Sequence, residues 1–241
     1  MTISADKLKD FFKYYDDGNG NHQGAIELLH EDLVTSAPRL LDDESEWIIK
    51  YREKPPVEEA PVGSVHANPL AVPYDCQLDH GSEGWRLCFT ASCAMTAKYW
   101  LPDLNIADYY ARRPQYGDST DASAQIRCLQ SFGLNARFVQ VGSAEKLKAQ
   151  IDRGRPAPVG YLHHGTPQNP SGGGHYSVCI GWSDEEECFI FNDPYGELNL
   201  LTGSYPNPGP YGKGVKYSYK NWVPRWSVSN DHDGWGLDIW K

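Results

Sequence analysis

Three short segments of the chain carry side chains that together could make an activated thiol. The segment WRLCFTASCAM contains Cys88, GGGHYSVCIGW contains His175, and FIFNDPYG contains Asp193. A thiol is mostly protonated at neutral pH, and it becomes a strong nucleophile when an imidazole and a helix N-terminus stabilise its thiolate. A carboxylate that accepts a hydrogen bond from the imidazole leaves the other ring nitrogen free to face the thiol. These residue types predict a cysteine hydrolase with a Cys–His–Asp triad.

The sequence around Cys88 predicts a helix that begins at or just before this residue. Gly84 ends a polar loop, and the apolar residues after it recur at helical spacing as far as Trp100. The N–H groups at a helix N-terminus lower the pKa of a thiol and can also hold an oxyanion. Cys93 lies inside the same predicted helix, and we interpret it as a small core residue.

His175 and Asp193 flank a predicted β-hairpin. Three glycines precede His175, and the apolar run after it predicts a strand over residues 176–181. Turn residues follow and end this strand. Its partner strand, residues 188–192, leads directly into Asp193. Two antiparallel neighbours can bring the imidazole and the carboxylate side by side. Since consecutive strand residues point to opposite faces, only one of Asn192 and Asp193 can reach His175.

The other periodic segments of this part of the chain predict an α+β fold. Helices are predicted over residues 121–131 and 143–153, and strands over residues 136–141, 157–163 and 234–240. A helical lobe would then face a lobe built on an antiparallel sheet. The thiol would lie on one side of the cleft between them and the imidazole on the other.

Together these segments resemble the papain-like superfamily of bacteriocin-processing, double-glycine-leader peptidases, family thirty-nine of the cysteine peptidases. The run VPYDCQLDHGSEGWRLCFTASCAM carries the likeness, which continues through LKAQIDRGRPAPVGYLHHG, GGGHYSVCIGW and FIFNDPYGEL and covers residues 72–203. The resemblance implies a two-lobed papain-like domain in which Cys88 is the nucleophile and His175 the base. Its NDP motif puts Asp193 at the orienting position, and the glutamine before the nucleophile, Gln77, at the side-chain oxyanion-hole position.

Two residues depart from the family pattern. Cys76, beside Gln77, has no family role, and Phe89 follows the nucleophile where a small residue is usual. Phe89 leaves the shape of the acyl pocket open. A loop glutamine is usually just solvated, but loss of one oxyanion donor typically costs about 3 kcal/mol of transition-state stabilisation, which favours the oxyanion role for Gln77.

Neither a metal nor a cofactor is expected. His80, His163 and His164 are the competing histidines, and the last two either shape the substrate cleft or, as the weaker alternative, bind a metal. No CxxC or HExxH motif occurs. The segment DDGNGN resembles a calcium loop, but His22 stands where an EF-hand needs glycine and Leu28 where it needs glutamate. We interpret that segment as a turn.

Composition excludes several partners. The 241 residues include 22 basic and 32 acidic side chains, a net charge of -10, which argues against nucleic-acid binding. The 6 cysteines lack the spacing of a small disulfide framework, so free thiols are expected. The N-terminus lacks a signal-peptide pattern, and no run of about 18 apolar residues occurs. Synthesis in the cytoplasm without a membrane span is therefore expected.

The chain is expected to divide into three parts. Residues 1–51 predict a small unit of helices, residues 52–68 are rich in proline, glycine and charge like a linker, and residues 69–241 form the papain-like domain. HQGAIELLHEDL and LLDDESEWIIKYR in the first part resemble short segments that accompany cell-wall-lytic domains in bacteriophage lysins and virion proteins. This likeness implies peptidoglycan as a substrate, phage virion proteins as partners, and action on a virion or at the bacterial cell wall.

Two functions from different classes follow from these observations. The first is a cysteine peptidase or amidase that cleaves peptide-type amide bonds, either in a polypeptide or in the stem peptides of peptidoglycan, as an endolysin does. The second is a phage virion or cell-wall-binding protein that retains the peptidase fold with little or no turnover. An unusually reactive thiol at Cys88 would distinguish the first from the second.

Overall fold

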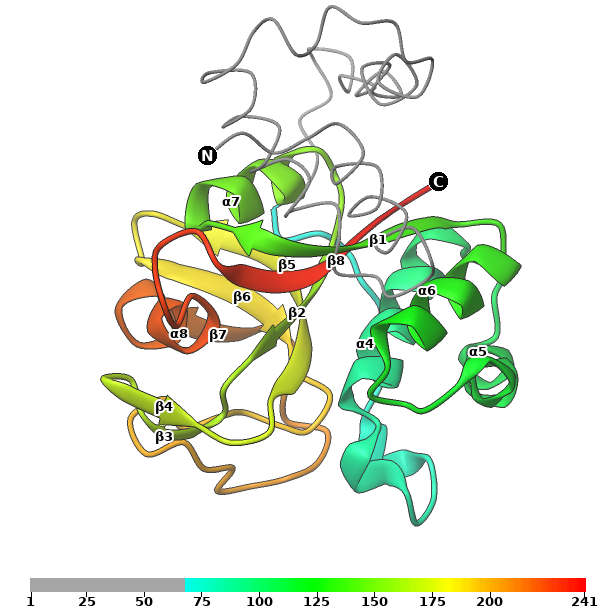
Figure 1. Ribbon diagram of the computed structural model, residues 1–241, viewed down its shortest axis with the longest axis horizontal. Coiled ribbons are helices and arrows are strands. Elements are labelled where there is room, and N and C mark those ends of the chain that lie inside the picture. The colour runs from blue at the N-terminus through cyan, green and yellow to red at the C-terminus, as the bar shows by residue number, and fades with distance from the viewer. Residues whose placement is uncertain (1–67) are drawn as a thin grey trace, which may run out of the picture. The chain divides into compact units, whose positions relative to one another are not determined.

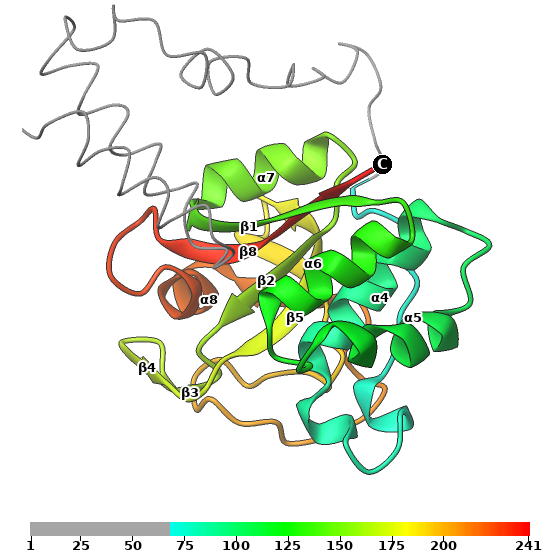
Figure 2. The ribbon, with the colours of Figure 1, turned by 45° about the vertical axis from the view of Figure 1, so that its right-hand side comes forward.

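An antiparallel sheet with helices beside it makes up the part of the chain that the computed structural model describes, residues 68–241 (Figure 1). Helices α4 (Cys88–Trp100), α5 (Ile106–Arg112) and α6 (Ala122–Ser131) gather on one side of the sheet in both ribbon views (Figures 1 and 2). The predicted N-terminal helical unit, the DDGNGN turn and the predicted linker up to residue 67 lie outside the described residues.

Six strands form the main sheet in the order β1-β8-β2-β5-β6-β7, and every neighbouring pair is antiparallel. They are β1 (Asn135–Gly142), β2 (Ala157–Tyr161), β5 (His175–Ser183), β6 (Cys188–Asn192), β7 (Val215–Ser218) and β8 (Gly234–Trp240). A small hairpin pairs β3 (His164–Thr166) with β4 (Asn169–Ser171). Helix α4 packs against β5 and β2, so the helix that begins at Cys88 lies against the strand that begins at His175.

Side-chain caps explain where several helices begin. The Asn105 side chain accepts a hydrogen bond from the Ala107 N–H at 3.2 Å before α5, and Asp121 accepts one from the Ser123 N–H at 2.8 Å before α6. Ser143 caps helix α7 (Ala144–Asp152) in the same way. Each cap satisfies a backbone donor that the first helical turn leaves without a partner.

The buried apolar side chains form two clusters. One lies among the central strands, α7 and helix α8 (Tyr219–Trp226), and includes Phe189, Phe191 and Trp222, all fully buried. The other joins α4, α5 and α6 to the strands β1 and β8, and Cys93 lies in it without exposure. The interpretation of Cys93 as a core residue is therefore confirmed. Full burial of a side chain of the size of Phe189 stabilises the folded state by about 1.5–3 kcal/mol.

The structure confirms the predicted α+β class and most predicted elements. The helices predicted over residues 88–100, 121–131 and 143–153 are α4, α6 and α7, and the predicted hairpin is β5 with β6. The strand predicted over residues 157–163 was wrong at its end, because β2 stops at Tyr161. There the Leu162 N–H donates to the carbonyl of Arg225 at 2.9 Å instead of to a neighbouring strand.

Several short elements were not predicted, namely the helices α5 and α8, the strand β7, the hairpin of β3 with β4, and three 3-10 turns. Helix α8 even contains Pro224, a residue that usually argues against a helix interior. Among residues 68–241 no helix is both long and apolar enough to cross a bilayer.

Candidate active site

Cys88 is the first residue of α4 and follows a 3-10 turn, η3 (Gly84–Arg86). Its side chain is partly exposed, unlike the other five cysteines, which are buried; all six are free thiols. The protein around the Cys88 thiol still removes much of its water and so opposes ionisation, but the hydrogen bond and positive charge of His175, together with the backbone N–H of Tyr176, outweigh this and lower the pKa of the thiol. The geometry therefore favours a thiolate at this helix start.

His175 is the first residue of β5, where it pairs with Tyr161 on β2. The side chain is buried, and its Nε2 lies 2.8 Å from Oδ1 of Asp193. Burial alone would lower the pKa of His175, whereas the charge and hydrogen bond of Asp193 and the hydrogen bond to Cys88 raise it to about 10. Because Nε2 is used by Asp193, Nδ1 is the nitrogen left to face the thiol.

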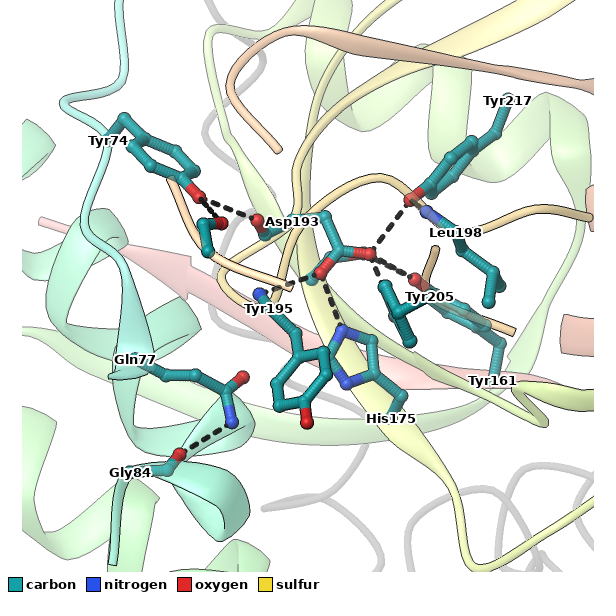
Figure 3. Close-up of polar contacts among 12 residues, drawn as sticks. Tyr74, Gln77, Gly84, Tyr161, His175, Asp193, Tyr195, Leu198, Tyr205 and Tyr217 are labelled. Atoms are coloured by element: carbon teal, nitrogen blue, oxygen red, sulfur yellow. Dashed lines mark hydrogen bonds and ion pairs between the residues drawn. The ribbon is translucent and has the colours of Figure 1, made fainter. Parts of the chain in front are cut away.

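Asp193 directly follows β6 and is fully buried. Its Oδ1 accepts hydrogen bonds from Nε2 of His175 at 2.8 Å and from the N–H of Tyr195 at 3.0 Å. Its Oδ2 accepts three more from tyrosine hydroxyls, as Figure 3 shows. A buried carboxylate is costly unless it is paired and hydrogen-bonded, and this one is both.

Asn192 points away from the imidazole, as the alternation of strand side chains predicts. Its Nδ2 donates to the carbonyl of Val72 at 3.0 Å, and its Oδ1 accepts from the N–H of Gly214 at 3.1 Å. Of the two neighbouring residues, Asp193 is the one whose side chain contacts His175.

Gln77 lies in a 3-10 turn, η2 (Gln77–Asp79), and is fully buried. Its Nε2 donates to the carbonyl of Gly84 at 2.7 Å, in the turn that leads to Cys88 (Figure 3). Its backbone N–H donates to the carbonyl of Pro194 at 2.9 Å, just after Asp193. Within residues 68–241 its Oε1 has no hydrogen-bond partner. Gln77 thus joins the segment before the thiol to the segment after the carboxylate.

Phe89 points into the core and is buried. Its ring stacks on that of Tyr176, with centroids 3.7 Å apart and an interplanar angle of 8°. Since Tyr176 directly follows His175, this stack holds the start of α4 against the start of β5. The unusual residue after the thiol therefore acts as a packing residue between two elements of the site.

The three competing histidines have different surroundings. Nε2 of His80 lies 2.9 Å from Oδ2 of Asp75. The His80 ring stacks on that of Tyr110, with centroids 3.6 Å apart. His164 donates from Nδ1 to the carbonyl of Gly203 at 3.2 Å. The ring of His163 lies 5.8 Å from that of His175. Burial and the nearby charges of His175 and His164 lower the pKa of His163 to about 4.

In the described part of the chain, no cluster of histidine, cysteine, aspartate or glutamate side chains has the geometry of a metal site.

The tyrosines around Asp193 are the part of the site that sequence reasoning missed. Tyr161, Tyr205 and Tyr217 come from β2, from the long segment between β6 and β7, and from β7. They share no motif and are far apart in the sequence. With 15 tyrosines in the chain, residue type alone gave no signal.

The helix that begins at the Cys88 thiol packs against an antiparallel sheet, and this sheet carries the buried His175–Asp193 pair. This arrangement is the α+β fold of the papain-like cysteine peptidases. Residues 69–207 match the Peptidase_C39 like family, and the match spans more than half of the chain. The chain belongs to the Peptidase_C39 like family. This confirms the resemblance inferred from the sequence motifs.

Solved structures similar to this chain include three peptidases at low identity. A double glycine motif protease from an AMS/PCAT transporter, in complex with the leader peptide, is 17% identical, with a TM-score of 0.47, covering 73% of this chain and 96% of that one. A putative C39-like peptidase from Bacillus anthracis is 13% identical, with a TM-score of 0.49, covering 73% and 98%. The peptidase domain of Streptococcus ComA, a bifunctional ABC transporter of a quorum-sensing pathway, is 18% identical, with a TM-score of 0.42, covering 65% and 92%. No curated protein sequence gives a significant match.

Proposed function

We propose that this chain hydrolyses peptide-type amide bonds with Cys88 as nucleophile, His175 as general acid and base, and Asp193 as the residue that orients His175. The observation that carries the proposal is the buried ion pair of His175 and Asp193, at 2.8 Å, beside a thiol whose pKa is lowered at a helix start. A lone buried histidine or a lone core cysteine would need no such arrangement.

In the proposed reaction the Cys88 thiolate attacks the carbonyl carbon of the amide and forms a tetrahedral intermediate. The imidazolium of His175 protonates the leaving nitrogen, so that the C–N bond breaks and a thioester remains on Cys88. A water molecule then gives a proton to His175 and attacks the thioester. The second tetrahedral intermediate then collapses, the C–S bond breaks and the acid product leaves, so that Cys88 is again a thiolate beside the imidazolium of His175.

The negative oxygen of both intermediates needs hydrogen-bond donors. We assign this role to the backbone N–H of Cys88, at the start of α4, and to the side-chain amide of Gln77. Nε2 of Gln77 carries two hydrogens, and the carbonyl of Gly84 accepts only one of them. The bond to Gly84 thereby fixes the amide while a second N–H stays available for the oxyanion.

The substrate class we propose is a peptide, with the stem peptide of peptidoglycan as the specific candidate. The candidate rests on the likeness of the N-terminal segments to those of phage lysins and virion proteins. The proposed role of residues 1–51 is then to bring residues 69–241 to a bacterial cell wall or to phage virion proteins.

The test compares wild type with Cys88→Ala on purified peptidoglycan and on a peptide library. We expect wild type to release new amino termini from at least one substrate and the variant to lose this activity. Cys93→Ala is the control, because its thiol is fully buried and burial raises its pKa well above the usual value. Equal activity of wild type and Cys88→Ala would overturn the mechanism.

Thiol alkylation separates the peptidase from the non-catalytic alternative without a substrate. We expect Cys88 to react with iodoacetamide well below pH ~8, faster than Cys93 or Cys128, because thiolate is the reacting species. If all the thiols reacted alike, the chain would be better described as a binding or virion component that keeps the peptidase fold.

A further inference from the structure

The Oδ2 atom of Asp193 accepts hydrogen bonds from three tyrosine hydroxyls at once. Tyr161 donates at 2.9 Å, Tyr217 at 2.9 Å and Tyr205 at 3.1 Å, while Oδ1 is left to His175 and the N–H of Tyr195 (Figure 3). One or two donors are enough to satisfy a carboxylate oxygen, which has two lone pairs. The number and convergence of these hydroxyls therefore require a reason beyond the filling of space.

Two of the hydroxyls are themselves aimed by a second hydrogen bond. The hydroxyl of Tyr161 accepts from Oγ of Ser177 at 3.2 Å, and that of Tyr217 accepts from the N–H of Leu198 at 2.8 Å. Because these partners donate, the proton of each tyrosine hydroxyl is directed to Asp193. Burial is the largest cause that raises the pKa of all three tyrosines well above its usual value, with the Asp193 charge adding to it, so they remain donors.

The third hydroxyl comes from a different kind of element. Tyr205 lies in the long segment 193–214 between β6 and β7, and it is only partly buried. The segment is attached at Leu200, whose carbonyl accepts from Arg225, and at Gly203, whose carbonyl accepts from His164. The ring of Tyr205 lies 5.4 Å from that of His175, so it contacts both members of the pair.

We propose that the hydroxyls of Tyr161, Tyr205 and Tyr217 form a tyrosine clamp that holds the Asp193 carboxylate in place against His175, with the segment 193–214 completing the site through Tyr205. This inference rests on the proposed thiol chemistry. The clamp residues are positioning residues: they act on the reaction only through Asp193.

The consequence for the thiol follows from the coupling of the groups. Without a clamp hydroxyl the carboxylate can rotate away from His175, which weakens the interaction that favours the imidazolium. The Cys88 thiolate then loses part of its charged partner and forms at a higher pH. Other groups face the pair as well: Tyr176 contacts Cys88, and His163 and Tyr195 lie beside His175.

The first measurement needs no substrate and follows the alkylation rate of Cys88 against pH in the full chain. Tyr205→Phe keeps the ring and removes only the hydroxyl, and Tyr219→Phe is the matched control. The Tyr219 hydroxyl donates to Asp184 at 3.0 Å, an exposed carboxylate that takes no part in the proposed reaction. We expect the onset of alkylation to move to higher pH in Tyr205→Phe, further in Tyr205→Phe with Tyr217→Phe, and not in Tyr219→Phe. An unchanged onset in the double variant would overturn the clamp.

The second measurement is a double-mutant cycle on peptide turnover. Tyr205→Phe should lower kcat by about tenfold, the size of one hydrogen bond to a charged group. In an Asp193→Ala background the same change should lower kcat by less than about twofold, because the residue acts only through Asp193. Equal losses in both backgrounds would show a merely structural role and overturn the proposal.

The Cys88→Ala comparison and the alkylation onset together keep the two proposals apart. If Cys88→Ala retained activity while the alkylation onset still moved in Tyr205→Phe, the proposed function would fail and the clamp would stand. If Cys88→Ala were inactive and the onset did not move, the function would stand and the clamp would fail.

Discussion

At the scale of single residues, two opposing influences act on His175. Its burial disfavours the imidazolium, whereas the Asp193 carboxylate and the hydrogen bond to Cys88 favour it, and the net effect raises its pKa to about 10. Asp193 has no exposed surface, and its carboxylate oxygens accept hydrogen bonds from His175 and from three tyrosine hydroxyls instead of from bulk water. Removing one partner of a buried pair leaves the other charge uncompensated, which costs more than the loss of a surface ion pair.

The first prediction at this scale contrasts Asp193 with its neighbour Asn192. Asp193→Ala should lower turnover by about tenfold or more, because catalysis by an imidazole depends on its orientation. Asn192→Ala should act through stability, since its amide joins Val72 to Gly214, and the loss of two buried hydrogen bonds should cost about 1–3 kcal/mol. Turnover and urea unfolding of both variants check this. Loss of turnover in Asn192→Ala with unchanged unfolding, beside an active Asp193→Ala, would reverse the assignment.

The second prediction concerns pH. In the mechanism that we propose, activity requires Cys88 ionised and His175 protonated. The pKa of the thiol is lowered from its usual value and that of the imidazole is raised to about 10. The rate should therefore rise as the thiol ionises, stay high through neutral pH, and fall only as pH approaches the value at which the imidazolium is lost. Both limbs belong to the coupled pair. The measurement is kcat/KM from about pH 4 to about pH 11. A fall already near pH ~7, the region of an unperturbed histidine, would contradict the ion pair.

At the scale of elements, the sequence predicted those parts of the site that local periodicity determines. The apolar run after Cys88 and the alternating hairpin around residues 176–192 each carry their own period, and both appear as predicted in α4, β5 and β6. Once this hairpin is predicted, His175 at the start of β5 is expected to lie beside Asp193, which follows β6.

The tyrosine clamp could not be predicted in this way. Tyr161 lies in a predicted strand, where a tyrosine is an ordinary residue. Tyr217 lies in β7, which was not predicted, and Tyr205 lies in the segment between β6 and β7. Their convergence depends on the strand order β2-β5-β6-β7, which brings residues 56 positions apart to one carboxylate oxygen. Pairing order is a long-range property, and a single sequence carries little direct information about it.

The short turn that carries Gln77 shows the same limit. Its place in the chain was predicted by the family pattern, whereas its support comes from three separate elements. Gly84 and Pro194 hold Gln77 itself, and Asp75, two residues before it, accepts from the hydroxyl of Tyr110 on α5 at 2.7 Å. Such contacts fix the amide that we assign to the oxyanion, and they become visible only once the elements are assembled.

At the scale of the whole molecule, every residue of the candidate site lies in one compact unit, His66–Lys241. This unit contains both apolar clusters and the complete main sheet. Its first residues are attached to the sheet, because the Asn68 side chain bonds the backbone of Trp182 at 2.8 and 3.0 Å and the Leu70 N–H donates to the carbonyl of Ile180 at 2.7 Å. A cut before residue 66 leaves these contacts intact.

We therefore predict that a variant lacking residues 1–65 folds and keeps the chemistry of the site. It should melt in one cooperative transition, alkylate Cys88 at the wild-type rate and cleave a short peptide with unchanged kcat, since it retains both described apolar clusters and every residue of the candidate site. If the N-terminal unit delivers the domain to cell wall, as we propose, only the turnover of intact peptidoglycan should fall. The same truncation carrying Cys88→Ala is the control for residual activity. Loss of alkylation and of the melting transition in the truncated chain would show that the first unit is part of the catalytic fold, and equal peptidoglycan turnover by both lengths would remove the delivery role.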